Sequence, residues 1–422
     1  GDGYVVTFAD NTDHLEIPQV TQAGWQVVGT SLGTFAYRVN NTAVTELNLL
    51  GNLGNASHRK AGDLYGVILL PDSATGADIE EARKLLIDRG SLDGSLEASY
   101  FTSWLGRTDI VEFKFVDLSN ATNVQSAWQS CTAMNAFPAL NLSSSTTLSY
   151  SWYGCSGLSN FGAIQAPVCT DFSNAWLGTS ALTSFPADAK LGTEVTNVNF
   201  TDAWRSSGLT SFSTPLPTAT GFTRAWFASS ITSFDLDILP EGIAFSATWQ
   251  QTNLSSFHTK LPKAISLEYA WYNNPQLTEF TVESLPECVN NYWAWRSCNL
   301  TSFSTSLPKT RQVSEAWRNN SNLTDFSAEV FANWNPSVIS NYVFHDTWKG
   351  CTSLTAQSVE NILVSIDASG KYGTATGAAG GGSIDSGIDI DYDGTTLSAA
   401  TNSAVDSLKA KGWSIIVNNV TL

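Results

Sequence analysis

Charged residues are scarce in this chain, and the scarcity limits what the protein can bind. Only 14% of the 422 residues are charged, and the formal net charge is −17, from 21 basic and 38 acidic residues. The basic residues do not cluster anywhere along the sequence. Binding to a phosphate backbone needs clustered cations that release counterions, so we do not expect nucleic acid as a partner.

Long apolar runs are also lacking. The longest are short strand-like segments such as GVILLP at 66–71, well below the ~18 residues of a membrane-spanning helix. We therefore expect no membrane insertion. With so few charges, the polar surface must come mostly from Ser, Thr and Asn, a composition common outside cells. Since the chain begins Gly-Asp-Gly and its only methionine is Met134, we expect an initiator residue upstream of Gly1.

Motifs for catalysis are missing as well. The four histidines are scattered, and we find no nucleophile elbow, no phosphate loop and no His/Cys or His/Asp spacing typical of a metal site. The sequence therefore predicts no enzymatic activity and no cofactor.

Tryptophan, in contrast, is abundant and regularly spaced. Eleven of the 15 tryptophans follow one another mostly at 22 to 24 residues. A unit of this size cannot bury its own apolar face and must stack on its neighbours, so the spacing predicts a solenoid. The register is set by Trp104, Trp128, Trp152, Trp176, Trp204, Trp226, Trp249, Trp271, Trp295, Trp317 and Trp348.

Two further apolar columns accompany the tryptophans. Leu, Ile or Met stands five or six residues after each Trp, and Phe stands three residues further on in ten of the eleven copies. The last copy has Gln357 in place of Phe, which suggests that a capping unit begins there. We predict that the Trp, Leu and Phe columns are all interior.

The spacing also predicts the secondary structure of each unit. A large apolar residue stands four positions before most of the tryptophans, and this i, i+4 pair favours one or two turns of helix. The Leu-x-x-Phe segment, often followed by Leu-Pro, favours a short strand closed by a turn. We therefore predict an α/β solenoid of about eleven strand-turn-short-helix units.

The repeats resemble the BspA-type leucine-rich repeats of bacterial surface antigens. Those units read roughly V-T-x-M-x-x-M-F-x-x-C-x-x-L-T-S-L, and VCTDFSNAWLGTSALTSF at 168–185 follows the pattern with Phe for the first Met and Ala-Trp for Met-Phe. The resemblance covers about residues 100–356, although the Trp preference departs from the common form. It implies a right-handed leucine-rich solenoid with a parallel sheet on one face.

The two ends carry no repeat. Residues 1–95 show strand-like segments at 4–8, 24–30, 45–50 and 66–71 and a helix at 77–90, which predicts a small α/β cap or attachment domain before a solenoid at 96–356. Residues 357–422 predict a C-terminal α/β cap, with helices at 354–367 and 398–412 and a last strand at 413–419. This tail resembles the C-terminal unit that follows similar Trp-rich repeats in marine bacteriophage structural proteins.

The cysteines fit two columns of the repeat better than they fit a disulfide framework. Four stand three residues after a Trp and two stand seven residues before one, where other copies have small polar residues. We predict that most or all are reduced and buried, although a bridge between the adjacent copies of Cys131 and Cys155 is left open. The six are Cys131, Cys155, Cys169, Cys288, Cys298 and Cys351.

A run of aspartates near the C-terminus has two interpretations. Asp389, Asp391 and Asp393 have spacings found in calcium loops, but Ala400 stands where an EF-hand needs Glu. The other interpretation is an edge strand with Ile388 and its alternate neighbours inward and the aspartates in solvent.

Three hypotheses for function follow. The first is a virion appendage resembling a tail fibre, which binds a host-surface glycan or protein or packs with other virion subunits. The second is a secreted or cell-surface adhesin or filament subunit, including contacts between copies of this chain. The third, a hydroxyl-lined solenoid that binds ice or crystalline polysaccharide, depends on the single column of Thr and Ser after the Leu positions.

The predicted working surface is the sheet face. If Phe points inward, its two neighbours point outward by the period of two in a strand. The candidate binding residues are Ser211, Ser213, Ser233, Asp235, Ser256, His258, Glu279, Thr281, Ser302 and Ser304.

Overall fold

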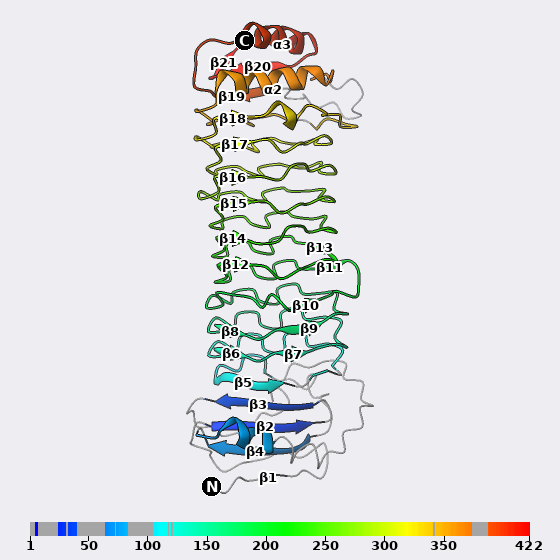
Figure 1. The fold of residues 1–422 in the computed structure, drawn as a ribbon, viewed down its shortest axis with the longest axis vertical. Coiled ribbons are helices and arrows are strands. Elements are labelled where there is room, and N and C mark those ends of the chain that lie inside the picture. Colours follow the sequence, from blue (N-terminus) through cyan, green and yellow to red (C-terminus); the bar gives the residue numbers. More distant parts are fainter. Residues whose placement is uncertain are drawn as a thin grey trace. The chain divides into compact units, whose positions relative to one another are not determined.

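The computed structural model describes residues 5–6, 24–30, 33–39, 64–71, 73–82, 104–116, 118–119, 121–340, 342–373 and 387–422. The chain divides into two compact units, Gly1–Thr218 and Ala219–Leu422, which we describe separately. In both units the chain winds into flattened coils that stack on one another, as a solenoid does (Figure 1). The boundaries predicted near residues 95 and 356 stay predictions.

The first unit begins with an antiparallel sheet. Strand β2 pairs with β3 and β4, and β3 pairs with β5, all antiparallel. Beyond β5 the two-residue strands β6 and β8 add in parallel, so this sheet continues into the parallel sheet of the coils. The strands are β1 (Val5–Val6), β2 (Gly24–Thr30), β3 (Gly33–Val39), β4 (Leu64–Pro71), β5 (Ile110–Val116), β6 (Ala136–Phe137) and β8 (Asn160–Phe161).

Most N-terminal elements expected from the sequence can be located. Strands β1, β2 and β4 overlap the predicted strand segments, whereas β3 is an addition that the sequence pattern did not indicate. The predicted helix is helical over residues 76–82, and its remainder lies outside the described residues. The predicted strand at 45–50 also lies outside them.

The strands inside the coils are very short. Each is two or three residues long, and those of the Phe column end on the Phe. In the second unit the register sets Phe257 opposite Phe280 and Phe303 opposite Phe326, in parallel. The first unit adds β7 (Leu140–Asn141), β9 (Ile164–Ala166), β10 (Lys190–Leu191), β11 (Val198–Asn199) and β12 (Ser211–Phe212). The second has β13 (Ala219–Gly221), β14 (Ser233–Phe234), β15 (Ser256–Phe257), β16 (Glu279–Phe280), β17 (Ser302–Phe303) and β18 (Asp325–Phe326).

The prediction of a short helix around each tryptophan is wrong. Among the described residues from 104 to 327 no helix forms, and each Trp lies in a run of overlapping turns. Around Trp249, for example, Ala247 and Gln251 have φ of 55° and 58°, which breaks the repeating geometry of a helix. The freed backbone N–H groups bond to the next coil instead, as from Trp249 N to the carbonyl of Ala270 at 2.8 Å.

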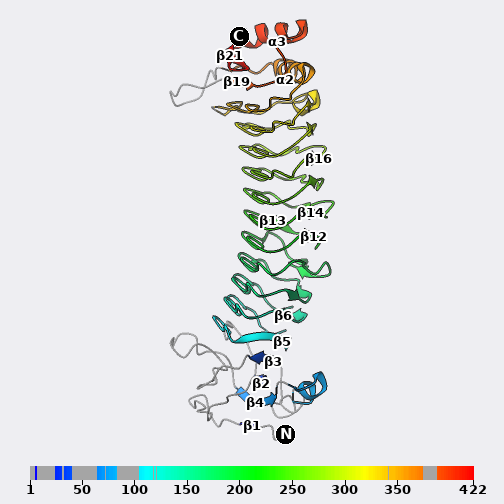
Figure 2. The same cartoon turned by 90° about the vertical axis from the view of Figure 1, so that its left-hand side faces the viewer.

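An aromatic ladder fills the interior of both units. All eleven tryptophans of the register are at most 2% exposed, and the Leu and Phe columns are buried with them, which confirms the predicted interior. In the second unit successive indoles stack at 5.2 to 5.9 Å between ring centroids. Each also meets a Phe nearly at right angles, as Trp249 meets Phe234 with ring centroids 5.3 Å apart and an interplanar angle of 79°. Figure 2 shows an edge-on view of the stacked coils whose side chains form this ladder.

The second unit ends in two helices and a small sheet. Helix α2 (Ala356–Ala368) is capped by Thr355, whose hydroxyl accepts from Ser358 N, and it buries Val359 and Ile362. After a 3₁₀ turn η2 (Ala328–Val330) and α2, the chain forms β19 (Gly387–Ile390), α3 (Ala399–Ala410), β20 (Ser414–Val417) and β21 (Val420–Thr421). Within the described residues, no helix combines the length and apolarity that crossing a bilayer requires.

Candidate functional site

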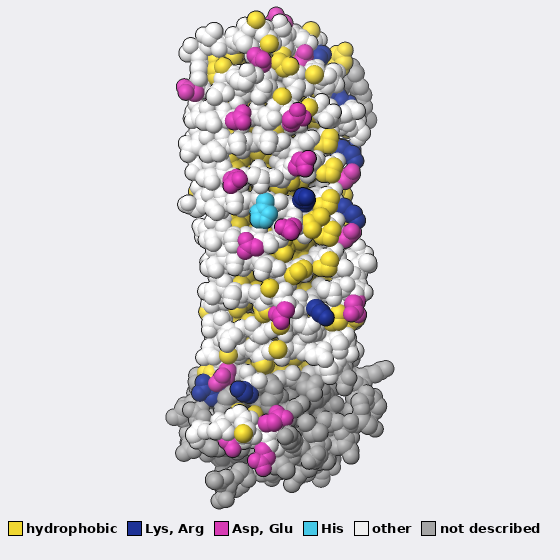
Figure 3. Space-filling model, viewed as in Figure 1, with side chains coloured by type: hydrophobic (Ala, Val, Ile, Leu, Met, Phe, Trp, Pro, Cys, Tyr) yellow, Lys and Arg dark blue, Asp and Glu magenta, His cyan; other side chains and the backbone are white. Residues whose placement is uncertain are grey.

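The predicted sheet-face residues lie at the surface. Every one of the ten is exposed or half-buried, while the Phe between each pair is buried. Ser233 donates a hydrogen bond to the Asp235 carboxylate at 3.2 Å, across the intervening Phe234. Figure 3 shows carboxylates and a histidine among mainly uncharged side chains on this side of the second unit. The structure therefore places the eight of these residues that belong to the second unit on one face of it, and places Ser211 and Ser213 at the surface of the first unit. Whether they bind a partner stays a prediction.

The hydroxyl column after the Leu positions has a structural role. The side chains of Thr278, Thr301 and Thr324 each donate to the backbone carbonyl of the corresponding residue in the preceding coil, at 3.1 to 3.3 Å. Thr210 does the same in the first unit at 3.2 Å. A donor held in this way is turned toward the neighbouring coil and not toward a ligand, which weakens the hypothesis of an ice-binding or polysaccharide-binding rank.

An aromatic cluster that the sequence reasoning missed lies in the turns around the buried tryptophans of two adjacent coils. Tyr269 and Tyr272 flank Trp271, and Tyr292 and Trp293 precede Trp295 in the next coil. All four side chains are half-buried, with ring centroids 5.3 to 6.1 Å apart in the five closest pairs. Burial, with Tyr292 and Glu268 nearby, raises the pKa of Tyr269 to about 12. The motif Y-x-W-Y could have indicated the cluster, but its two tyrosines lie outside the Trp, Leu and Phe columns of the repeat.

A ladder of ion pairs borders this cluster. The guanidinium of Arg296 lies 3.6 Å from the ring centroid of Trp293 and is paired with Glu315. Glu315 also pairs with Arg318 at 2.9 Å, and Arg318 pairs with Asp346 at 2.6 Å. The partly buried charges of three successive coils are thus mutually neutralised.

The aspartates of the calcium-like segment seal the end of the coils. The carboxylate of Asp389 accepts from Asp346 N at 3.2 Å, and that of Asp391 accepts from Gly350 N at 2.8 Å. In other coils the backbone N–H groups at the positions equivalent to Asp346 and Gly350 donate to carbonyls of the next coil. Asp389 and Asp391 are half-buried against the last coil, so the expectation that all three aspartates lie in solvent holds only for Asp393.

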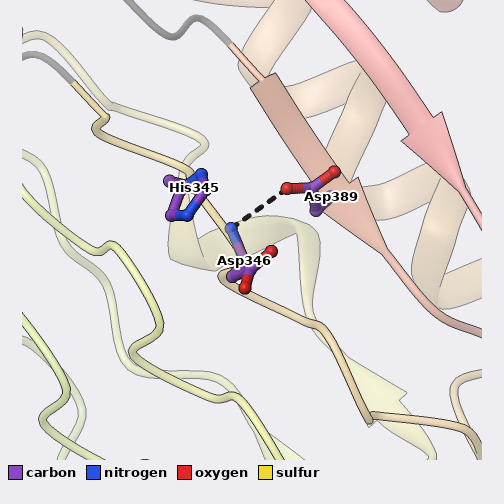
Figure 4. A group of neighbouring side chains, drawn as sticks. All are labelled: His345, Asp346 and Asp389. Atoms are coloured by element: carbon purple, nitrogen blue, oxygen red, sulfur yellow. Dashed lines mark hydrogen bonds between the residues drawn. The ribbon is translucent and has the colours of Figure 1, made fainter. Parts of the chain in front are cut away.

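One group of metal-ligand type forms at this seal. Ligand atoms of His345, Asp346 and Asp389 lie within 4.8 Å of one another (Figure 4). Burial raises the pKa of Asp389 above its ordinary value, and the nearby Asp346 charge adds to the rise. Both oxygens of Asp346 already face cations, Oδ1 toward Lys349 and Oδ2 toward Arg318, so a metal would have to displace those pairs.

All six cysteines are free and buried, as predicted. The Sγ of Cys155 donates to the carbonyl of Trp128 in the preceding coil at 3.0 Å, and Cys298 does the same to Trp271 at 3.1 Å. In the equivalent position of another coil, Asn274 Nδ2 donates to the carbonyl of Trp249 at 2.8 Å. Burial raises the pKa of Cys298 to about 12, so the thiols act as small interior hydrogen-bond donors.

Comparison with known proteins adds little to these observations. No protein-family model and no curated protein matches the sequence. Among solved structures, a leucine-rich repeat protein from Bacteroides ovatus is similar over 61% of this chain and 82% of its own, with 12% identity and a TM-score of 0.28. None of these comparisons supports the likeness of the C-terminal segment to bacteriophage structural proteins, which rests on the sequence alone.

Proposed function

We propose that this is a non-enzymatic recognition or structural protein exposed on a phage virion, as an appendage resembling a tail fibre or attached to the capsid. There it binds a host-surface glycan or protein, or packs with other virion subunits. The observation that supports this proposal is the row of exposed polar side chains that repeats, coil after coil, on either side of the buried Phe column.

This row suits contact better than chemistry. Its backbone is held by parallel strand pairs, and the aromatic ladder beneath it is close-packed, so the outward side chains are presented on a stiff support. Their identity changes from coil to coil: Ser233 and Asp235, then Ser256 and His258. A fixed spacing with a varied side-chain pattern can be specific for one partner without any catalytic group.

A cellular surface location is the second candidate. The surface rich in Ser, Thr and Asn and the resemblance to BspA-type surface antigens favour a secreted or cell-surface adhesin or filament subunit equally well. Neighbouring tail and capsid genes would favour the virion, whereas a secretion signal or an anchor encoded upstream of Gly1 would favour the cell surface.

The sheet face can be tested by adding bulk and charge to it. We expect a variant with arginine at Ser233, Asp235, Ser256 and His258 to keep its circular dichroism and melting temperature, because all four side chains point out of the coil. The same variant should lose adsorption of labelled protein to host cells, or assembly into particles or filaments measured by sedimentation.

A matched control carries four arginines on the same two coils but off the sheet face. All four of its positions are exposed, and both variants gain the same number of arginines. Unchanged adsorption and unchanged assembly in the sheet-face variant would reject this surface, as would equal losses in the control. The control positions are Ala228, Ser230, Gln251 and Asn253.

A further inference from the structure

We propose that the aromatic cluster of the second unit, formed by Tyr269, Tyr272, Tyr292 and Trp293, is a saccharide-binding site. It lies in the turns around the buried tryptophans and not on the sheet face, so it does not rest on the function proposed above.

The fold does not require aromatic residues at these positions. Tyr269 and Tyr272 stand two residues before and one residue after the buried Trp271, and the same two positions around Trp249 hold Ala247 and Gln250. Large aromatic side chains that remain partly exposed and form one contiguous cluster, where a small or polar residue is sufficient, indicate a contact outside the chain. Trp293, like Ala247, adopts a left-handed backbone conformation, with φ of 57°.

The cluster is held rigidly before any ligand arrives. Arg296 covers one face of Trp293 at 3.6 Å, and its guanidinium is fixed by Glu315, whose carboxylate is also bound by Arg318 at 2.9 Å. Tyr272 and Tyr292 pack against Trp293 at 5.4 Å each. A platform whose rotamers are already fixed loses little conformational entropy when a ligand binds. This lowers the free-energy cost of binding, which matters most for a small ligand that makes few contacts.

The size and composition of the cluster favour a saccharide over a protein. The aromatic residues occupy two adjacent coils, about 10 Å at the ~4.8 Å spacing of parallel strands. A stable protein interface buries about 800 Å² per partner, and a cluster limited to two coils is small for that purpose. Beyond the cluster lie Ala247 and Gln250 on one side and the paired Glu315 and Arg318 on the other. Tyr and Trp offer an apolar ring with a polar edge, which matches the C–H face and hydroxyl rim of a sugar.

The first unit repeats half of this arrangement. Tyr150 and Tyr153 flank Trp152 at the same two positions, in a second Y-x-W-Y motif. Their ring centroids lie 5.7 Å apart, and Tyr150 is 37% exposed. The next coil has Asn174 and Leu177 where the second unit has Trp293 and Arg296, so this pair lacks the second half of the platform. It therefore provides an internal control for the larger cluster.

The experiment is a titration of the full chain with three neutral hexasaccharides: cellohexaose, chitohexaose and laminarihexaose. Calorimetry or ligand-observed NMR should show saturable binding of at least one. We expect Trp293→Ala and Tyr272→Ala each to weaken this binding about tenfold, which corresponds to roughly 1.4 kcal/mol. Tyr153→Ala should change it less than twofold, and melting temperatures check that every variant is folded.

Either of two results would overturn the proposal: no saturable binding of any of the three saccharides, or unchanged affinity in both Trp293→Ala and Tyr272→Ala. A partner that proves to be a protein, with the saccharides inert, would assign the cluster to a protein interface instead. The sheet-face arginine variant should bind the saccharide as the unmodified protein does, so failure of this site and failure of the sheet face can be told apart.

Discussion

The interior and the outer turn positions of each coil share one backbone register but tolerate very different residues. Inside, each coil places Trp and Leu or its equivalent at the same points, with Phe in all but the last, and these side chains are buried. Outside, the residue two positions before the Trp is Arg224, Ala247, Tyr269, Trp293 and Glu315 in successive coils of the second unit. The interior therefore specifies the fold, and the outer positions are free to carry function.

The hydrogen-bond pattern explains this freedom. Backbone N–H groups of one coil bond to carbonyls of the next along the turns, as Tyr269 N bonds to Tyr292 O at 2.9 Å. Because the backbone is satisfied by the neighbouring coil, an outer side chain is not needed to support it. Three predictions would break or sharpen this contrast.

The largest expected effect is the loss of an interior indole. Trp249→Ala should destabilise the protein by about 3 to 5 kcal/mol, because it leaves a cavity between two neighbouring coils. The adjacent outer substitution Gln250→Ala should stay within about 0.5 kcal/mol. Denaturant unfolding of both variants checks the contrast, and similar losses in the two would refute it.

The second prediction concerns thiol reactivity at pH 8. Burial raises the pKa of Cys131 to about 12, with a similar value at Cys351, so the thiolate fraction in the folded protein is very small. Relative to a free thiol we expect reaction with a disulfide reagent to be slower by on the order of 10³. A cysteine introduced at the exposed Asn253 should react at the ordinary rate. Rapid labelling of the six native cysteines before unfolding would contradict their interior placement.

The smallest effect tests the turn geometry itself. Ala228 is exposed and has φ of 52°, a conformation that costs an L-residue energy but costs glycine none. Ala228→Gly should leave stability unchanged or raise it by up to about 1 kcal/mol. If the segment were the predicted short helix, the same change would lower stability by about 0.5 to 1 kcal/mol. The sign of the change in melting temperature therefore distinguishes the two.

The sequence predicted the interior well because the interior repeats. Counting from one Trp to the next placed the buried Trp, Leu and Phe columns of the register, and it explained why Cys155 and Cys298 occupy a small polar column. The local helix prediction failed for a physical reason. The i, i+4 pair of Phe245 and Trp249 does meet, with stacked rings 5.7 Å apart, but across left-handed turns that only a neighbouring coil can stabilise.

The candidate sites were predicted less completely. The period of two in a strand placed the sheet-face residues outward, as at Asp235 and His258. The aromatic cluster could not be found in this way, because Tyr269 and Tyr272 contact Trp293 of the following coil, more than 20 residues away. Likewise, the aspartate run could not be interpreted until its backbone partners, Asp346 and Gly350, were known.

By itself, the sequence determined that the chain stacks small units around one aromatic interior, because a unit of 22 to 24 residues with three large apolar side chains has no other way to bury them. Only the tertiary structure decided how the backbone turns at each Trp and which outer side chains meet. Both depend on hydrogen bonds and contacts between coils, such as Trp249 N to Ala270 O, and these exist only after the neighbouring coil has folded beside the first.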